Sequence, residues 1–136
     1  MYRLIACDLD ETLLDKSRHV SKRTQETIKM AEAQGLIFAP ATGRGFYSIK
    51  QTLEELEAVN KSNHYMIGFN GGVVVENHGP TIIKDFPMPF EILSRLFEFG
   101  SNYQVAIHLY TFEQTYVYHS NPEEDAYFCL LYTSDA

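Results

Sequence analysis

The chain has 136 residues, 45% of them hydrophobic, which is enough for one globular domain with a buried core. Its 11 basic and 18 acidic side chains give a net charge of −7, and no cluster of Lys and Arg provides the basic footprint of a nucleic-acid-binding protein. The N-terminus lacks the apolar segment of a signal peptide, and no apolar run reaches the ~18 residues of a membrane span. We therefore expect a cytoplasmic protein without nucleic-acid or membrane partners.

Two aspartates follow the first apolar run. Residues 3–9 are typical of a strand, whose alternate side chains share a face, so Asp8 and Asp10 should lie together with Cα atoms roughly 6–7 Å apart. Carboxylates ~6 Å apart repel by about 3 kcal/mol at an effective dielectric constant of about 20, and Mg²⁺ with a bound phosphate would offset this repulsion. Such a pair can divide phosphoryl transfer between a nucleophile and a proton shuttle. The alternative is that Asp8 caps a turn and Asp10 is solvated at a strand end.

Strands and helices then alternate, which is the pattern of a parallel α/β sheet. Ser21 is placed to cap a helix over 22–34, and Gly35 is placed to stop it. The next predicted elements are a strand over 36–41, a helix over 46–58 and a strand over 65–69. Ligands bind at the carboxyl ends of the strands in such sheets, so the turns after the three strands should meet in one crevice.

The turns after the second and third strands carry the other candidate site residues. In the turn over 42–45, Gly43 and Gly45 let the backbone approach an oxyanion, and the following helix presents its positive end. Arg44 either steadies a phosphate or lies on the surface, and both interpretations stay open. Asn70, which precedes two glycines, either lies near the ligand or makes a tight turn into the next strand.

The character of the chain changes at Pro87 and Pro89, which indicate a boundary. Before it, a hairpin is predicted from strands over 73–76 and 81–84. After it, a helix over 90–97 and strands over 105–110 and 116–119 predict a small α+β unit. The expected domains are therefore 1–86 and 87–136.

Cysteine and histidine predict no further chemistry. Cys7 lies in a strand that we expect to be buried, where it acts as a small hydrophobic side chain. Cys7 and Cys129 are too few for a disulfide framework. The five histidines lack the short paired spacing of a zinc site, and only His108 and His119 could face each other across a hairpin.

The segment Asp8-Leu9-Asp10-Glu11-Thr12 resembles the first motif, Asp-x-Asp-x-Thr, of the haloacid dehalogenase (HAD) superfamily of phosphohydrolases. The resemblance implies that Asp8 is a nucleophile that forms an aspartyl-phosphate and that Asp10 is the general acid/base. It also implies that Asp8 and the backbone carbonyl of Asp10 bind Mg²⁺. Glu11 departs from the glycine that many members carry, which concerns the backbone geometry of the turn and not the chemistry.

Two later turns extend the resemblance. Thr42 resembles the second motif, a Ser or Thr whose hydroxyl and neighbouring N–H groups hold the transferred phosphoryl group; the alternative is a Thr-Gly loop that merely begins a helix. The segment 70–72 resembles a turn of the Cof-like branch. The resemblance implies a Rossmann-like parallel sheet, here an incomplete HAD-like core over 1–86, and the beginning of an inserted α+β cap of type IIB over 87–136.

The implied function is Mg²⁺-dependent hydrolysis of small phosphate monoesters, such as sugar phosphates or phosphorylated cofactors. An alternative is a non-catalytic phosphate-binding fragment or module. An aspartyl-phosphate receiver domain is a third candidate, but it carries its phosphorylated Asp on a later strand, and the third strand here ends in Asn70. The substrate itself and the oligomeric state are not readable from the residues.

The superfamily's third motif, a Lys, and its fourth, an acidic pair, are not found after Tyr116, so the chain is expected to be inactive alone. It should also expose an apolar strand edge over 4–7, because strands beyond the cap would pair there, and so be prone to intermolecular pairing. The final residues, 130–136, look like a translated adaptor tail rather than native sequence.

Overall fold

The computed structural model describes residues 2–123, 125 and 126. The chain divides between Phe86 and Pro87, where the proline pair begins, into the units Met1–Phe86 and Pro87–Ala136. The predictions for Cys129 and for the tail over 130–136 lie outside the described residues.

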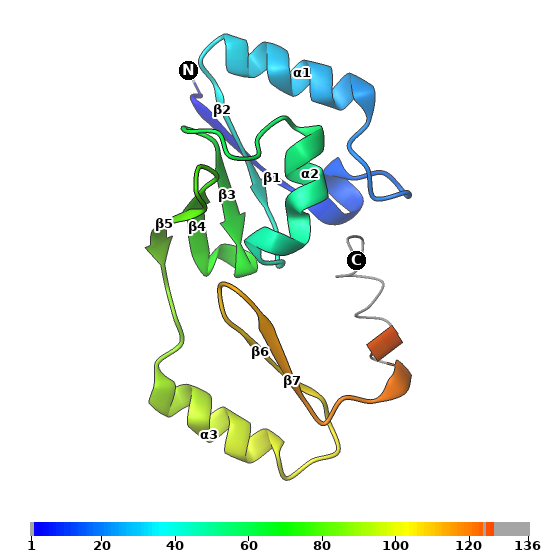
Figure 1. Cartoon of the computed structure of the whole chain (residues 1–136), viewed down its shortest axis with the longest axis vertical. Helices are drawn as coiled ribbons and strands as arrows, with labels where there is room; N and C mark the ends of the chain where they lie inside the picture. Colours follow the sequence, from blue (N-terminus) through cyan, green and yellow to red (C-terminus); the bar gives the residue numbers. More distant parts are fainter. Residues whose placement is uncertain (1, 124, 127–136) are drawn as a thin grey trace. The chain divides into compact units, whose positions relative to one another are not determined.

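The first unit is built on a five-stranded sheet with the order β1-β2-β3-β4-β5. Three strands run parallel, namely β1 (Leu4–Asp8), β2 (Ile37–Ala41) and β3 (Tyr65–Gly68). An antiparallel hairpin of β4 (Val73–Glu76) and β5 (Thr81–Asp85) continues the sheet beyond β3. The α/β class, the parallel order of the first three strands and the hairpin are therefore confirmed (Figure 1).

The first helix forms as its end signals predict. α1 spans Lys22–Ala33, and the Ser21 hydroxyl accepts a hydrogen bond of 3.2 Å from the N–H of Thr24. Gly35 has φ +85°, a left-handed conformation that costs glycine little and ends the helix.

The helix predicted over 46–58 is wrong in its continuity. The structure has a 3-10 turn over Phe46–Ile49, followed by a short α2 over Lys50–Glu55. The break lies at Ile49, whose φ of −116° and ψ of 18° are not helical. The helix stops early because Glu57 adopts a left-handed φ of 52°, and the N–H of Ala58 donates to the carbonyl of Leu53, 2.8 Å away.

The core of the first unit is formed by buried side chains of the sheet, of α1 and of the segment over 46–58, and Figure 1 shows α2 in front of β1 and β2. Three apolar residues at helical spacing in the segment over 46–58 are buried, with Ile49 and Leu53 at 1% exposure and Leu56 at 9%. Leu9, Met66 and Val75 are fully buried as well. The sheet strands that carry the candidate site therefore rest on a packed layer.

The expectation of a buried first strand is wrong for this chain, whereas the exposed apolar edge predicted over 4–7 is observed. Leu4 is 51% exposed and Ile5 is 44% exposed, whereas Ala39 on β2 is 1% exposed. The reason is position, because β1 is the end strand of the sheet and pairs with β2 alone within the described residues. Cys7 is consequently half-buried rather than fully enclosed.

The second unit contains α3 (Phe90–Gly100) and an antiparallel hairpin of β6 (Ile107–Tyr110) and β7 (Thr115–Tyr118). α3 ends three residues later than predicted, at Gly100. The rings of Phe97 and Tyr118 lie 5.1 Å apart, so helix and hairpin are in contact. No residue of α3 is buried, and Phe90, Leu96 and Phe99 are each more than half exposed.

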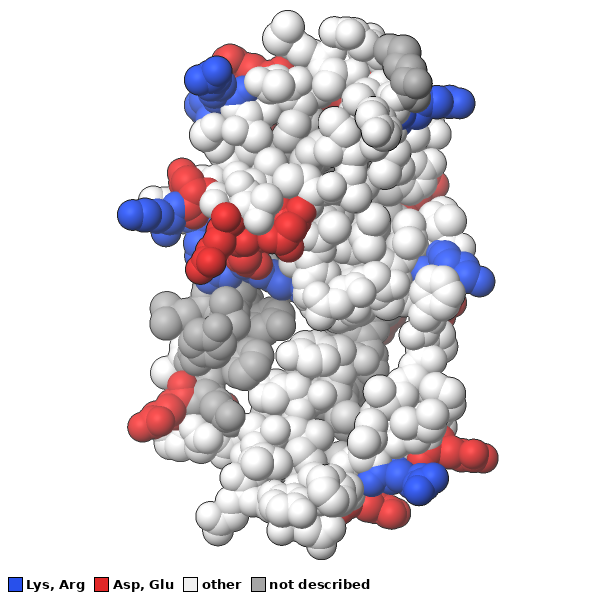
Figure 2. Space-filling view, turned by 180° about the vertical axis from the view of Figure 1, so that it is seen from behind, with Lys and Arg blue, Asp and Glu red and all other residues white. Residues whose placement is uncertain are grey.

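Within the described residues, no helix is long and apolar enough to cross a membrane. On the face seen in Figure 2, basic side chains lie beside acidic ones rather than in a continuous field of one sign.

Candidate active site

The first turn begins where β1 ends. Leu9 is completely buried, while Asp8 before it and Asp10 after it are exposed, so both carboxylates stay on the solvent side of the turn. The chain bends over Leu9–Leu13, and the N–H of Leu14 donates to the carbonyl of Leu9 at 2.9 Å. This alternation is what the strand pattern predicts for Asp8 and Asp10.

Glu11 occupies the strained position of the turn. Its φ of 59° and ψ of 10° are left-handed, which costs a residue with a Cβ about 1–2 kcal/mol relative to the right-handed region. A glycine would avoid this cost. The departure at Glu11 therefore leaves the path of the turn intact, at some expense in stability.

Thr12 was not among the predicted site residues, although it closes the same motif. Its hydroxyl donates to Oδ2 of Asp8 at 3.0 Å. The bond fixes one oxygen of the Asp8 carboxylate and leaves the other to face a ligand. The sequence signal was the spacing of four residues between Asp8 and Thr12.

The second loop is held by backbone hydrogen bonds to β3 and to the turn that follows β3. Thr42 is only 6% exposed, and its N–H donates to the carbonyl of Ile67 at 2.9 Å. Its hydroxyl oxygen accepts from the N–H of Arg44 at 3.2 Å, which leaves the hydroxyl hydrogen available to a ligand. A 3-10 turn and not a long α-helix follows this loop, so the positive helix end predicted here is not present.

The third turn packs directly on the second. The N–H of Asn70 donates to the carbonyl of Thr42 at 3.1 Å, and the N–H of Phe69 donates to the carbonyl of Arg44 at 3.2 Å. A Cβ on Gly43 would lie 3.1 Å from the Asn70 side-chain oxygen, so the absence of a side chain at Gly43 is what lets the Asn70 amide lie over the loop. Asn70 itself has φ 54°.

Arg44 joins the second loop to the first. Its guanidinium Nη2 forms an ion pair with Oδ1 of Asp10, and the Arg44 side chain is only 13% exposed, against 50% for Asp10. Neither of the two interpretations of Arg44 included this contact, which joins residues 34 positions apart. Two close carboxylates repel each other unless a positive charge offsets their repulsion. Arg44 provides that positive charge at Asp10.

All three turns lie at one edge of the sheet. β1 and β2 pair in parallel with Asp8 opposite Ala41, and Ala41 lies opposite Ile67 of β3. The structure therefore brings together every predicted site residue, namely Asp8, Asp10, Thr42, Gly43, Arg44 and Asn70, within the first unit.

The donor chemistry of this edge fits a hard divalent cation in part. Among the described residues, no three His, Cys, Asp or Glu side chains gather as a metal site. Mg²⁺, however, is commonly held by one or two carboxylates together with waters and substrate phosphate. With Asp10 paired to Arg44, the Asp8 carboxylate and the backbone carbonyl of Asp10 are the oxygens suited to that role.

Cys7 contributes no nucleophile. Burial, with a smaller effect from the neighbouring Asp8 charge, raises the pKa of the Cys7 thiol, so that it stays protonated and unreactive near neutral pH.

Comparison with known proteins identifies the family. The sequence model of the haloacid dehalogenase-like hydrolases matches residues 5–133, and the chain belongs to this family. It is 32% identical over 120 residues to the Streptococcus pyogenes serotype M6 protein named "Putative phosphatase M6_Spy0533", an alignment that covers 88% of this chain and 43% of that protein. A Thermoplasma volcanium phosphoglycolate phosphatase is 36% identical over 86 residues, or 63% of this chain and 36% of the relative.

Solved structures agree on the fold. A haloacid dehalogenase-like hydrolase from Bacteroides thetaiotaomicron superposes with a TM-score of 0.78 at 25% identity, covering 99% of this chain and 53% of that one. The HAD subclass IIB sugar phosphatase BT4131 superposes with a TM-score of 0.79 at 23% identity, over 100% of this chain and 51% of that one. At this identity the match shows that the two proteins share a fold and nothing more. The sheet is thus the Rossmann-like sheet of the HAD fold, and the chain spans about half the length of these relatives.

Proposed function

We propose that this chain is the N-terminal part of a Mg²⁺-dependent phosphatase that hydrolyses small phosphate monoesters through an aspartyl-phosphate on Asp8. One observation carries the proposal: Asp8, Asp10, the loop over 42–45 and Asn70 meet at the carboxyl ends of three parallel strands. The two relatives compared above are both named as phosphatases, which supports the same chemistry.

Asp8 is the proposed nucleophile because it is exposed and one of its oxygens is already fixed by Thr12. A free carboxylate oxygen attacks phosphorus, the bond to the ester oxygen breaks, and an acyl phosphate remains on Asp8. Water then attacks this phosphorus, which releases inorganic phosphate and restores the carboxylate. A bound Mg²⁺ would neutralise charge between Asp8 and the phosphate oxygens.

Asp10 is the proposed general acid/base. It gives a proton to the departing alcohol and takes one from the attacking water. The ion pair with Arg44 holds the Asp10 side chain at the edge of the loop that begins with Thr42. Arg44 therefore supports catalysis here by orienting Asp10, and its guanidinium has further donors for a phosphate oxygen.

Thr42 and Gly43 form the proposed phosphate cradle, whereas Gly45 lies against the Phe69 ring, which is 2.8 Å from where its Cβ would be. The Thr42 hydroxyl can donate its hydrogen to a phosphate oxygen while its oxygen accepts from Arg44. Gly43 exposes its backbone to such an anion without a side chain in the way, and Asn70 adds an amide beside it.

Sugar phosphates or phosphorylated cofactors are the proposed substrates, the first unit being the proposed catalytic core and the second the beginning of a cap. The 136-residue chain alone should not hydrolyse substrate, because neither the Lys of the third superfamily motif nor the acidic pair of the fourth is found after Tyr116. In this chain by itself we expect phosphate binding to fail before chemistry begins, because the later cation and acidic pair are missing beside Asp8 and Asp10. A non-catalytic phosphate-binding fragment is the alternative.

The decisive experiment is to read the coding DNA beyond codon 136 and express both the 136-residue chain and the extended protein. We expect p-nitrophenyl phosphate hydrolysis that requires Mg²⁺ and stops with EDTA in the extended protein only. Hydrolysis by the 136-residue chain, as a monodisperse monomer in sedimentation, would overturn its inactivity. An extended protein that lacks phosphatase activity would overturn the function itself.

A further inference from the structure

A tight hairpin follows the turn that carries Asp8 and Asp10. Leu14 and Val20 form an antiparallel bridge, and both are buried. Between them, the N–H of Asp15 donates to the carbonyl of His19 at 2.9 Å, and the Asp15 carboxylate accepts from the N–H groups of Ser17 and His19. The bonds make residues 14–20 one small rigid segment, so whatever holds its end also holds the turn before it.

The end of this hairpin is bound by one carboxylate from a distant helix. Glu55 is at the last position of α2: its Oε1 lies 2.5 Å from Nδ1 of His19, and its Oε2 accepts from the N–H of Val20 at 2.6 Å. Gln51, one helical turn earlier, donates its amide to Glu55 at 3.1 Å. Each oxygen of a single carboxylate is thus engaged, and the side chain is only 18% exposed.

The protonation state of Glu55 follows from this geometry. The N–H of Val20 can only donate, so Oε2 of Glu55 is an acceptor. Nδ1 of His19 lies beside both Oε1 of Glu55 and, at 2.9 Å, the amide nitrogen of Gln51. Burial opposes ionisation of Glu55, but the donors from Val20, His19 and Gln51 outweigh it and hold the pKa of Glu55 below its ordinary value. Glu55 is therefore an anion at neutral pH.

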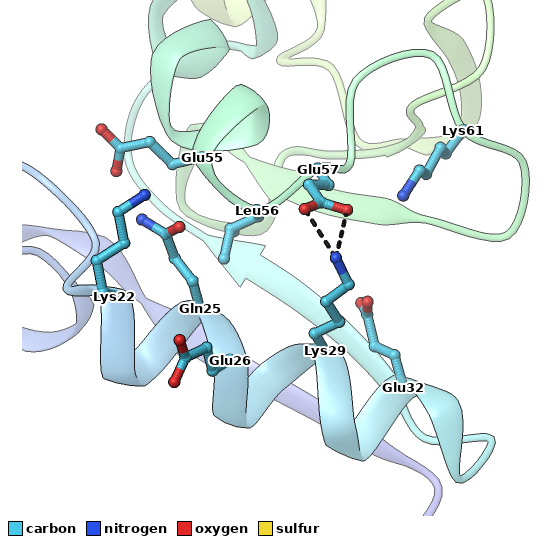
Figure 3. A pocket seen from close by; sticks show the side chains of 9 residues that line it. All are labelled: Lys22, Gln25, Glu26, Lys29, Glu32, Glu55, Leu56, Glu57 and Lys61. Carbon is cyan, nitrogen blue, oxygen red and sulfur yellow. Dashed lines mark hydrogen bonds and ion pairs between the residues drawn. The ribbon is translucent and has the colours of Figure 1, made fainter.

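Other charges around Glu55 lie on α1 and in the hairpin. Lys22 and Glu26 of α1 line the same groove as Glu55, together with Gln25, and Figure 3 shows Lys22 and Gln25 pointing toward the end of α2. The Gln25 amide donates to the carbonyl of Val20 at 2.7 Å, which is a second link to the hairpin end. Charges of both signs face the groove, so Glu55 is distinguished by its direct bonds to the hairpin.

Glu55 also stands on the segment that continues from the proposed phosphate cradle. The chain runs from the loop over 42–45 through the 3-10 turn Phe46–Ile49 into α2, whose Ile49 and Leu53 are packed in the core. The carboxylate thereby joins two segments separated by 35 residues, one downstream of Asp10 and the other downstream of Thr42.

We propose that Glu55 is a positioning residue that holds the hairpin over 14–20, and with it the turn of Asp8 and Asp10, against the segment that carries the Thr42 loop. The contacts of Glu55 with His19 and Val20 do not depend on the function of the protein. The statement that the two segments form one active site rests on the proposed function.

The test compares Glu55→Gln with Glu54→Gln in the extended protein, by amide hydrogen exchange and by amide NMR shifts. Glu54 is the matched control, since it is the neighbouring helical glutamate, is 55% exposed and lies 3.7 Å from Lys50. We expect Glu55→Gln to speed exchange at Val20 and His19 by about 10- to 100-fold, the loss typical of a hydrogen bond to a charged group. It should also shift the amide resonances over 9–13, while exchange in β3 stays unchanged.

Three outcomes would overturn the proposal: equal behaviour of the two variants, exchange that accelerates evenly over the whole unit, or a loosened hairpin with no shift over 9–13. His19→Ala keeps the test open if Glu55→Gln does not fold, since it removes one donor to the carboxylate from an exposed site and should loosen the same amides less. These measurements need no phosphatase activity, so an inactive extended protein would refute the proposed function and leave this inference standing.

Discussion

The two loops that build the candidate site are held in opposite ways. The turn of Asp8 and Asp10 follows an end strand, is open to solvent and carries the charge. The loop over 42–45 lies between two strands, has a buried Thr42 and is bonded along its backbone to the neighbouring turn at Phe69 and Asn70. One loop supplies reactive groups, and the other supplies a rigid frame.

The difference has an electrostatic reason. Unpaired carboxylates are costly to bury, so Asp8 and Asp10 stay at the exposed edge of the sheet, and the Arg44 guanidinium compensates Asp10. A threonine hydroxyl is neutral, and the oxygen of Thr42 already accepts from the N–H of Arg44, so burying Thr42 costs much less than burying a carboxylate. Charge changes in the first loop should therefore act on chemistry, and changes in the second on binding.

The largest expected effect is that of Asp8→Asn. In the extended protein this change should abolish turnover of p-nitrophenyl phosphate, because an amide neither attacks phosphorus nor binds Mg²⁺ as an anion. Circular dichroism and urea unfolding would verify that the variant is folded. Retained turnover would remove Asp8 as nucleophile and with it the assignment of chemistry to the first loop.

Asp10→Asn should have a smaller effect in the same assay. The amide cannot shuttle a proton, and we expect kcat to fall by roughly 10²- to 10⁴-fold. A leaving group that needs no proton should be affected less than a sugar alkoxide, and comparing the two substrates would isolate the proton transfer. If both substrates lose equally, Asp10 acts by holding the turn with Arg44 rather than as an acid/base.

Thr42→Val tests the binding side of the comparison. The variant keeps the volume but loses the hydroxyl, and affinity for vanadate or beryllofluoride with Mg²⁺ should fall by about 1–3 kcal/mol in calorimetry of the extended protein. Because the hydroxyl also accepts from Arg44, unfolding should be measured in parallel. Unchanged affinity would mean that Thr42 only begins the next helical segment.

The smallest effect should come from Glu11→Gly. Glycine adopts the φ of 59° at this position without the strain of a Cβ, so folding should gain up to about 1 kcal/mol, less the greater entropy of glycine in the unfolded chain. Urea unfolding of the 136-residue chain measures this, with Glu76→Gly in β4 as a control that should destabilise. A clear loss of stability in Glu11→Gly would show that the Glu11 side chain supports the turn.

Local patterns of the sequence already determined much of this protein. The alternation of apolar and polar residues around Leu9 put Asp8 and Asp10 on the solvent side, and Ser21 and Gly35 marked the ends of α1. The alternating strands and helices then predicted that three polar turns meet at one edge of the sheet. These features depend on neighbours within a few residues, and such interactions are readable along the chain.

Only the tertiary structure decided the rest. No feature inside the first strand encodes the exposure of Leu4 and Ile5: the family resemblance predicted the open edge over 4–7, and the place of β1 at the end of the sheet produces it. The pairs Arg44 with Asp10 and Glu55 with His19 join residues 34 and 36 positions apart. Their partners are chosen by how strands and helices pack in space, and a charged residue seen in sequence alone looks the same whether it pairs or faces water.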